Sequence, residues 1–184
     1  MKIEYQKCVP QELFEHNIRA SKLAEELAER FGADSKKAKI AGLIHDVAFP
    51  RTGELLKLAD KYGIPYGEIE KQAPILLHGP VGAEITKELF EIDDTEIYSA
   101  IYKHTTGAEE MSILDKVVFL ADKSEPASND PDVKKTRQLS ERSLDKAIIN
   151  YIDHIIPLQL EKGFLIHLDL IAMRNKLLLE LKES

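Results

Sequence analysis

Apolar residues at helical spacing run through most of the 184-residue sequence, and this pattern constrains the fold more than any other feature. Over residues 13–31 the apolar positions recur at intervals of three, four or seven, while glutamates and lysines take the opposite side. We expect an amphipathic helix there, ended by Gly32, and a second helix over about 36–47, capped by Asp34 or Ser35. The second helix is apolar around most of its circumference and is predicted to lie centrally.

Further helices are expected at about residues 54–62, 80–90, 95–104, 112–122, 140–162 and 169–182. The proline-containing polar segment 123–135 is the candidate for a long functional loop, and Pro157 is expected to kink or break its helix. The sequence has no strand-like alternation and no internal repeat, so the predicted fold class is all-α. The length suits a single domain over 1–184, with a core at about 13–124 and C-terminal helices at about 140–182.

The charge and cysteine content restrict the expected partners and location. The formal net charge of -7 gives no cationic surplus for nucleic acid or an anionic membrane, although a small phosphorylated ligand remains compatible. No apolar run approaches the ~20 residues of a membrane-spanning helix. The chain starts without the apolar core of a secretory signal, and Cys8 is its single cysteine, so we expect a cytoplasmic protein.

Four polar side chains fall on apolar helix faces or at their ends: His16, the adjacent pair His45 and Asp46, and Asp122. Buried imidazoles and carboxylates need partners. Taken singly, each has a simpler interpretation, such as a hydrogen-bonded core histidine. Together they form a mixed nitrogen and oxygen set suited to Fe(II), Mn(II) or another divalent ion. Asp115, seven residues before Asp122, is interpreted as a supporting or, more simply, a helix-capping carboxylate.

Three further polar residues lie near predicted helix boundaries. His78 precedes the helix start at Gly79 and Pro80, where free N–H groups favour a phosphate. His104 ends an apolar stripe, and Thr105 adds a hydroxyl donor beside it. The simpler alternatives are a helix-start residue for His78 and a carbonyl-bonded core imidazole for His104. His154 and His167 have no comparable setting, and no role is assigned to them.

The order of these residues resembles that of the HD-domain hydrolases, which have a first His, a later His-Asp pair and a distant Asp. More closely, the chain is similar to the YqeK family in HGPVGA (78–83), HTTG (104–107), MSILDKVVFLAD (111–122) and the following EP (125–126). The likeness runs from about residue 13 to 175. It implies an HD-type helical bundle.

The resemblance also implies an activity, a cofactor and site residues. The implied reaction is symmetrical hydrolysis of diadenosine tetraphosphate to two ADP by metal-activated water, with iron as the metal and manganese as its alternative. His16, His45, Asp46 and Asp122 would be metal ligands, and Asp46 is also a candidate base. The pocket for the nucleotide would be lined by Asp46, His78, His104, Thr105 and Asp122. There His78 and His104 would stabilise developing charge or hold a second ion. A homodimer is left open.

Two departures from the family pattern remove positive charge near a polyphosphate. Phe49 stands where Lys commonly follows HDVA, and Ser128 stands where Arg is common; Arg51, Lys103 or Lys123 are candidate replacements. Two alternatives therefore stay open. One is an HD phosphohydrolase for another nucleotide, such as a cyclic phosphodiester or a deoxynucleoside triphosphate, since fold and metal do not decide the substrate. The other is a non-catalytic nucleotide-binding helical module.

Overall fold

The computed structural model describes residues 5–183, and within that range it contains helices and no strands, which confirms the all-α prediction. The elements are α2 (Gln11–Phe31), α3 (Ser35–Ile44), η1 (Phe49–Glu54), α4 (Leu55–Tyr62), α5 (Glu68–Gln72), η2 (Pro74–Leu77), α6 (His78–Phe90), α7 (Thr95–Lys103), α8 (Ile113–Lys123), α9 (Pro131–Ser140), α10 (Leu144–Glu161) and α11 (Leu168–Glu183), where η marks a 3-10 helix.

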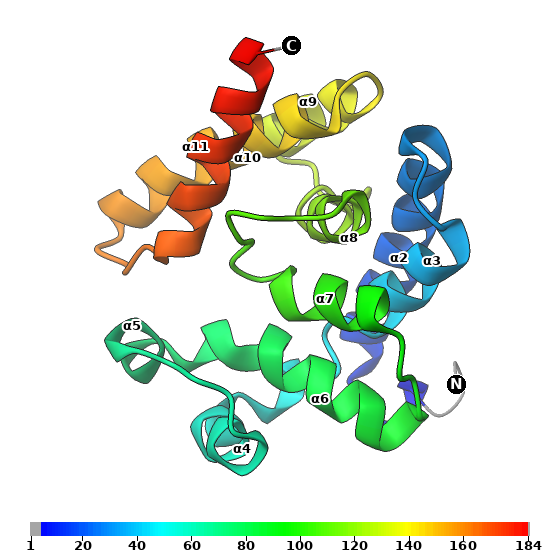
Figure 1. Cartoon of the computed structure of the whole chain (residues 1–184), viewed down its shortest axis with the longest axis vertical. Helices are drawn as coiled ribbons and strands as arrows, with labels where there is room; N and C mark the ends of the chain where they lie inside the picture. Colours follow the sequence, from blue (N-terminus) through cyan, green and yellow to red (C-terminus); the bar gives the residue numbers. More distant parts are fainter. Residues whose placement is uncertain (1–4, 184) are drawn as a thin grey trace.

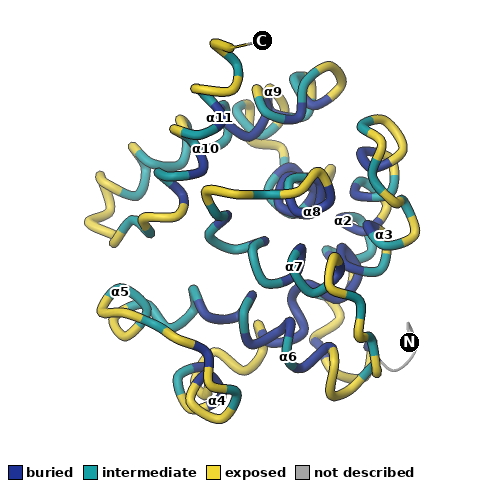
Figure 2. Tube along the Cα trace, viewed as in Figure 1, coloured by how far each residue is buried: buried dark blue, intermediate teal, exposed yellow. Residues whose placement is uncertain are grey.

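Helix α8 is the centre of the arrangement. It packs against α2, α3, α7 and α10, so both halves of the chain meet on it. In Figure 1, α8 is seen nearly end-on, with α2 and α3 on one side, α7 below it and α9 to α11 on the other side. Figure 2 shows that α8 is dark blue over most of its length, because it is buried by these neighbours.

The expected capping residues begin and end the helices that carry the site. Gly32 adopts the left-handed conformation (φ 79°) that ends α2, and its N–H donates to the carbonyl of Ala28. The Asp34 carboxylate then accepts from the first N–H groups of α3. At the start of α8, Ser112 and Asp115 form a reciprocal capping box. Asp115 is therefore a helix-capping carboxylate, the simpler of the two roles expected for it.

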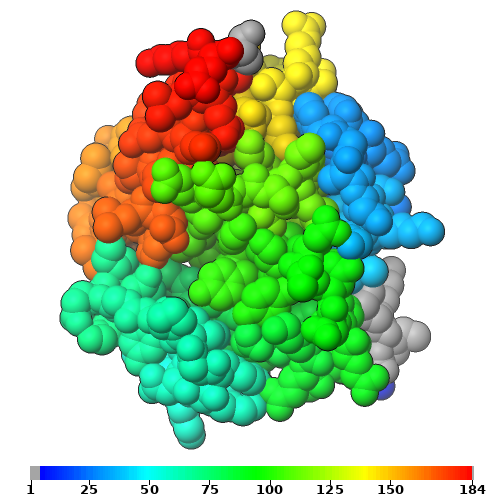
Figure 3. All heavy atoms as spheres, in the orientation of Figure 1, coloured from blue at the N-terminus to red at the C-terminus, as the bar shows by residue number. Residues whose placement is uncertain are grey.

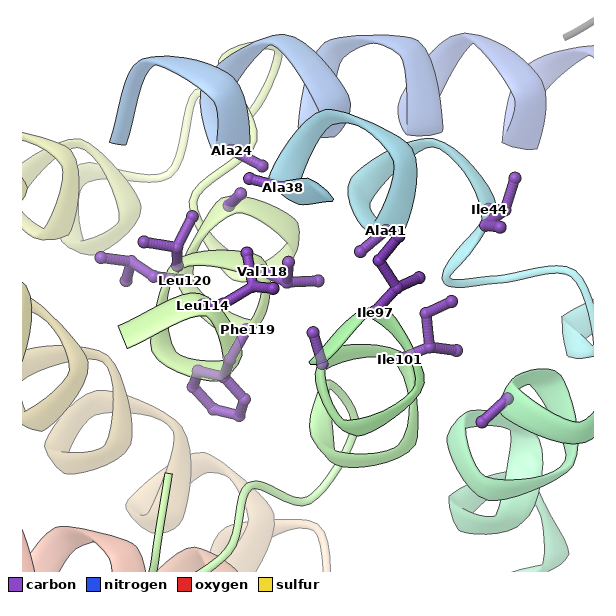
Figure 4. Close-up of a cluster of buried hydrophobic side chains, with 14 of the residues drawn as sticks. Ala24, Ala38, Ala41, Ile44, Ile97, Ile101, Leu114, Val118, Phe119 and Leu120 are labelled. Carbon is purple, nitrogen blue, oxygen red and sulfur yellow. The ribbon is translucent and has the colours of Figure 1, made fainter. Parts of the chain in front are cut away.

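Side chains from four helices fill the core between α8 and its neighbours. Figure 4 shows buried residues of α2, α3, α7 and α8, among them Ala24, Ala38, Ala41, Ile44, Ile97, Ile101, Leu114, Val118 and Leu120, while Phe119 of α8 points away from α2 and α3 and contacts the Tyr151 ring of α10. Small alanines on α2 and α3 allow these two helices to approach closely, while the larger side chains of α7 and α8 fill the remaining space. This packing fixes the helix ends at which the polar residues lie.

The C-terminal helices cover the opposite side of α8. In Figure 3, the orange and red segment lies directly against the green segment that precedes α8. Met173 of α11 reaches Gly107, where an added Cβ would come within 2.4 Å of the methionine methyl group. No helix of residues 5–183 combines the length and the apolar character needed to cross a bilayer.

Several predicted boundaries are wrong. Helix α3 ends at Ile44, so His45 and Asp46 lie in the turn that follows it. Much of the predicted loop 123–135 is helical, because α8 runs through Lys123 and Asp130 caps α9 with Pro131 in its first turn. Helix α9 has few apolar residues, so its sequence lacks the periodic pattern that predicts a helix.

Pro157 is expected to kink or break its helix, and the structure shows no break there. Helix α10 runs through it from Leu144 to Glu161. A proline removes one backbone donor, so the helix loses the single hydrogen bond to the carbonyl four residues earlier and is continued by the bonds of its other residues.

Candidate metal centre

The four residues predicted as metal ligands come together beside α8. His16 projects from α2, His45 and Asp46 follow the end of α3, and Asp122 lies near the end of α8. One ligand atom from each lies within 4.8 Å of the others. Figure 1 shows these three helices adjacent to one another, although their residues are separated by as many as 106 positions in the chain.

The spacing of these atoms fits a divalent ion. His16 Nε2 is 3.0 Å from Asp122 Oδ1, and His45 Nε2 is 3.2 Å from Asp46 Oδ2 and 3.5 Å from Asp122 Oδ1. His16 Nε2 and Asp46 Oδ2 are 4.0 Å apart. With metal–ligand bonds of ~2.1 Å, neighbouring ligands of an octahedral ion are about 3.0 Å apart and opposite ones about 4.2 Å. The observed separations lie close to this range.

A second set of ligand atoms shares Asp46 with the first. Asp46 Oδ1 is 3.3 Å from His78 Nε2 and 3.5 Å from His104 Nε2, and the two Nε2 atoms are 2.9 Å apart. All three residues are buried. Asp46 thus presents Oδ2 to one set and Oδ1 to the other, so its carboxylate belongs to both candidate ligand sets.

Backbone carbonyls fix the protonation of three of the four rings. The Nδ1 atoms of His45, His78 and His104 lie 3.0, 2.5 and 2.7 Å from the carbonyl oxygens of Gly42, Ile75 and Ile101. A carbonyl only accepts hydrogen bonds, so each Nδ1 carries a hydrogen and each Nε2 faces the site. His45 Nε2 is buried and makes no well-aligned hydrogen bond, although the Asp46 and Asp122 carboxylates lie near it, and this arrangement fits a metal ligand.

The electrostatics of the first set favour positive charge. Burial disfavours the His45 imidazolium, but the Asp46 and Asp122 carboxylates outweigh burial and raise the pKa of His45 to about 10. Burial also acts against charge on both carboxylates. Even so, His45, His104 and His78 hold the pKa of Asp46 well below its usual range, and Lys123, His16 and His45 do the same for Asp122. Both acids are ionised near pH 7, ready to bind a cation.

His104 behaves differently from His45. Burial lowers the pKa of His104 to about 4, against the pull of Asp46. The ring therefore stays neutral near pH 7 and keeps its Nε2 lone pair available. Thr105 lies beside it, with Oγ1 3.3 Å from His104 Nε2 and 3.2 Å from His78 Nε2.

Close packing of two helices brings His78 and His104 together. A Cβ added to Gly79 would lie 2.8 Å from both Thr105 Oγ1 and the Tyr102 carbonyl oxygen, so α6 approaches the end of α7 more closely than other residues allow. The expected helix start after Gly79 is wrong, because α6 begins at His78 and continues directly from η2. The N–H of His78 donates to the Ile75 carbonyl. The structure gives this helix start no free N–H at His78 for a phosphate.

Of the basic residues that are candidates to supply positive charge for a polyphosphate, Lys123 lies at the candidate metal centre. Its Nζ is 2.7 Å from Asp122 Oδ2 and lies over the Phe119 ring. Burial acts against its charge, but Asp122 raises the pKa of Lys123 above its usual range. Lys103 instead pairs with Asp115 at 2.9 Å, at the capping box of α8.

The two positions at which the sequence is expected to lack a basic residue, Phe49 and Ser128, also have distinct surroundings. The Phe49 ring packs edge-on to the His78 ring at 5.4 Å between centroids and is 43% exposed, so it lies between this histidine and solvent. The Ser128 carbonyl accepts a hydrogen bond from Arg137 at 3.0 Å. The guanidinium of Arg137 thus reaches the loop that contains Ser128.

Comparisons with known proteins agree with this geometry. A family model described as the HD domain matches residues 13–127. A protein of Halalkalibacterium halodurans named bis(5'-nucleosyl)-tetraphosphatase, symmetrical, is 36% identical over 92% of this chain and 90% of its own length. A protein of Bacillus subtilis with the same name is 37% identical over 85% of this chain and 86% of its own length.

The fold has a match among solved structures. A crystal structure from Clostridium acetobutylicum, described as a predicted HD superfamily hydrolase involved in NAD metabolism, has a TM-score of 0.93 and 30% identity. It covers 97% of this chain and 96% of its own. With a family model over more than half of its length and relatives above 30% identity, the chain belongs to the HD domain family and, within it, to the YqeK family.

Proposed function

We propose that this protein is a metal-dependent phosphohydrolase that cleaves diadenosine tetraphosphate symmetrically into two ADP. The observation that carries the proposal is the position of Asp46, whose two oxygens face two separate sets of imidazole nitrogens. The names of the curated relatives, which match this chain over most of its length, support the choice of substrate.

The residues divide into two ligand sets around Asp46. His16, His45, Asp46 and Asp122 would hold one ion, and Asp46, His78 and His104 a second. The mixture of imidazole and carboxylate ligands suits Fe(II) or Mn(II), and we propose iron as the native metal with manganese as a substitute. Bound ions of this kind polarise phosphorus and lower the pKa of water toward neutrality, which supplies a nucleophile near pH 7.

We assign Asp46 to metal binding rather than to proton abstraction, the other role expected from the sequence. Both of its oxygens face imidazoles, and its pKa lies well below the usual range, so it is a weak base at neutral pH. His104, kept neutral by burial, and His78 provide Nε2 lone pairs to the same site. We therefore assign the two histidines to metal binding rather than to hydrogen bonding with the phosphate.

Lys123 and Thr105 are the groups of this chain that would contact the polyphosphate. The Lys123 ammonium, at 2.7 Å from Asp122 Oδ2, lies at the edge of the first set, and the Thr105 hydroxyl lies at the edge of the second. A charged or hydroxyl donor placed toward a leaving phosphate typically contributes a few kcal/mol. Water adds to one phosphorus, the central P–O–P bond breaks, and the second ADP leaves with the bridging oxygen.

Product analysis tests the proposal. The protein, purified without chelator and supplied with Fe(II) or Mn(II), is incubated with diadenosine tetraphosphate and a panel of other nucleotides. We expect ADP as the only product from the tetraphosphate, no turnover after chelation, and no turnover by Asp46→Asn. A His154→Ala variant, which changes a histidine outside both ligand sets, serves as the active control. Release of ATP and AMP, or faster turnover of another nucleotide, would contradict the assigned substrate.

A further inference from the structure

Three of the four histidines in the centre are oriented by backbone, and the fourth is not. The carbonyls that accept from His45, His78 and His104 belong to the last turns of α3, η2 and α7, three residues before each ring. His16 lies inside α2, where the backbone carbonyls are used by the helix itself. Its ring therefore needs another acceptor to hold Nε2 toward the metal site.

The Glu125 carboxylate is placed on the other side of the His16 ring. Glu125 Oε2 lies 3.8 Å from His16 Nδ1, while Asp122 Oδ1 lies 3.0 Å from Nε2. The Glu125 side chain is 11% exposed, so its charge is largely shielded from water. A small rotation of either side chain brings Oε2 within the ~2.8 Å of a charge-assisted hydrogen bond.

The remaining contacts of Glu125 hold it in this position. Its Oε1 accepts from Arg19 Nε, one turn after His16 on the same helix, and from the Ala127 N–H at 3.1 Å. Oε2 is left for His16. The carboxylate is thus tied to α2 from one side and to its own loop from the other.

The loop that carries Glu125 is itself clamped. Arg137 of α9 donates to the carbonyls of Ser124, Glu125 and Ser128 at 3.1, 2.8 and 3.0 Å. The Ser124 hydroxyl donates to the Leu120 carbonyl of α8 at 2.6 Å. These bonds fix the backbone that follows Asp122, so the separation between Glu125 and the metal ligands is set by folding.

We propose that Glu125 is a positioning residue that accepts the Nδ1–H of His16 and so presents His16 Nε2 to the metal. The inference rests on the proposed function, because it assigns His16 as a ligand. Carboxylates in this position orient the ring and raise the basicity of its other nitrogen, and their removal typically weakens metal binding by about 10- to 100-fold.

Metal affinity and ring protonation test the proposal without measuring turnover. Mn(II) dissociation constants are measured for the wild type, Glu125→Ala, Glu125→Gln and a control, Glu26→Ala. The control removes an exposed carboxylate from α2, the helix that carries His16. We expect a weakening of about 10- to 100-fold for Glu125→Ala and a smaller one for Glu125→Gln, which keeps an acceptor oxygen. The control is expected to bind as the wild type does.

The zinc-loaded protein labelled with ¹⁵N-histidine gives the second readout. We expect a slowly exchanging His16 Nδ1–H signal in the wild type and in Glu125→Gln, and its loss in Glu125→Ala. If Glu125→Ala fails to fold, Glu125→Gln alone decides: wild-type affinity with no His16 Nδ1–H signal overturns the proposal. Unchanged affinity and signal in a folded Glu125→Ala overturn it too. A wild type that binds neither Mn(II) nor Zn(II) overturns the proposed function as well.

Discussion

The Nε2 atoms of His78 and His104 lie 2.9 Å apart, although both rings already donate their Nδ1–H to backbone carbonyls. The two Nε2 atoms face each other, and the Thr105 hydroxyl beside them can donate its one hydrogen to only one of them. A cation bound by both nitrogens would satisfy them together. The pair therefore has the spacing of two ligands of one ion.

Removal of one member of this pair is expected to remove one ion. His104→Ala should reduce the Mn(II) bound at saturation from two per chain to one, and reduce turnover by on the order of 100-fold, since both ions act on the phosphate. Equilibrium dialysis followed by metal analysis measures the stoichiometry. The variant His154→Ala changes a half-buried histidine that pairs with Asp132, apart from both ligand sets, and should retain both ions of the centre. Two tightly bound ions in His104→Ala would show that this pair is not a ligand set.

The metal-free protein is expected to lose stability as the pH rises. The pKa of His45 in the folded protein is about 10, whereas an unfolded histidine has a pKa of about 6.5. The folded state therefore holds a proton that the unfolded chain has lost, and the stabilisation is complete below pH ~6.5 and disappears as the pH rises through about 10. Urea unfolding with chelator at pH 6.5, 8 and 9.5 measures it. His45→Asn should flatten this dependence, and an equally steep decline in that variant would contradict the assignment.

Phe49 gives a test of the missing basic charge. Its exposed ring lies beside His78, so Phe49→Lys places a cation at the entrance to the site. A gain of about 1 kcal/mol, the Coulomb energy of a charge pair ~4 Å apart in water, corresponds to a roughly fivefold lower KM for the tetraphosphate. Steady-state kinetics at low and high salt should show the gain fading with salt.

The matched control for this variant is Leu89→Lys. It adds the same charge to an exposed position of α6 that lies about 16 Å along the helix from His78. It should leave KM unchanged. An equal gain in both variants would mean that net charge alone attracts the substrate, and that the position of residue 49 has no special role.

Gly79 is expected to be essential to the approach of α6 and α7. Gly79→Ala would force the helix away from Thr105 Oγ1 and the Tyr102 carbonyl, and overpacking of this kind typically costs 1–3 kcal/mol. Urea denaturation and metal titration measure the loss of stability and of the second ion. Gly53→Ala, whose Cβ would meet no atom within 4 Å, is the control. Equal stability of the two variants would contradict the proposed close contact.

The sequence predicts the fold class and the main helices because their apolar spacing and capping residues are local signals. Gly32, Asp34 and Ser112 each act where the sequence places them. Helix α9 was missed because it has little apolar periodicity and is held by contacts such as those of Arg137 with the preceding loop. Such contacts involve distant segments and leave no local pattern.

In the candidate site, too, local spacing predicts some features, while others depend on contacts between distant segments. Helical spacing directs His16 inward, and the structure brings it to Asp122. Spacing alone could not show that Asp46 faces two ligand sets, because this depends on the turn that follows α3. The sequence places the helix start after His78, whereas the structure begins α6 at His78 itself. The acceptor proposed for His16, Glu125, lies on a loop more than 100 residues away in the chain, which no local pattern can indicate.

The bridging position of Asp46 is the central claim, and electron paramagnetic resonance of the manganese-loaded protein tests it most directly. At two Mn(II) per chain we predict the multiline spectrum of an exchange-coupled pair, replaced in Asp46→Ala by the six-line signal of isolated ions. A six-line spectrum from the wild type at every loading would contradict the shared carboxylate.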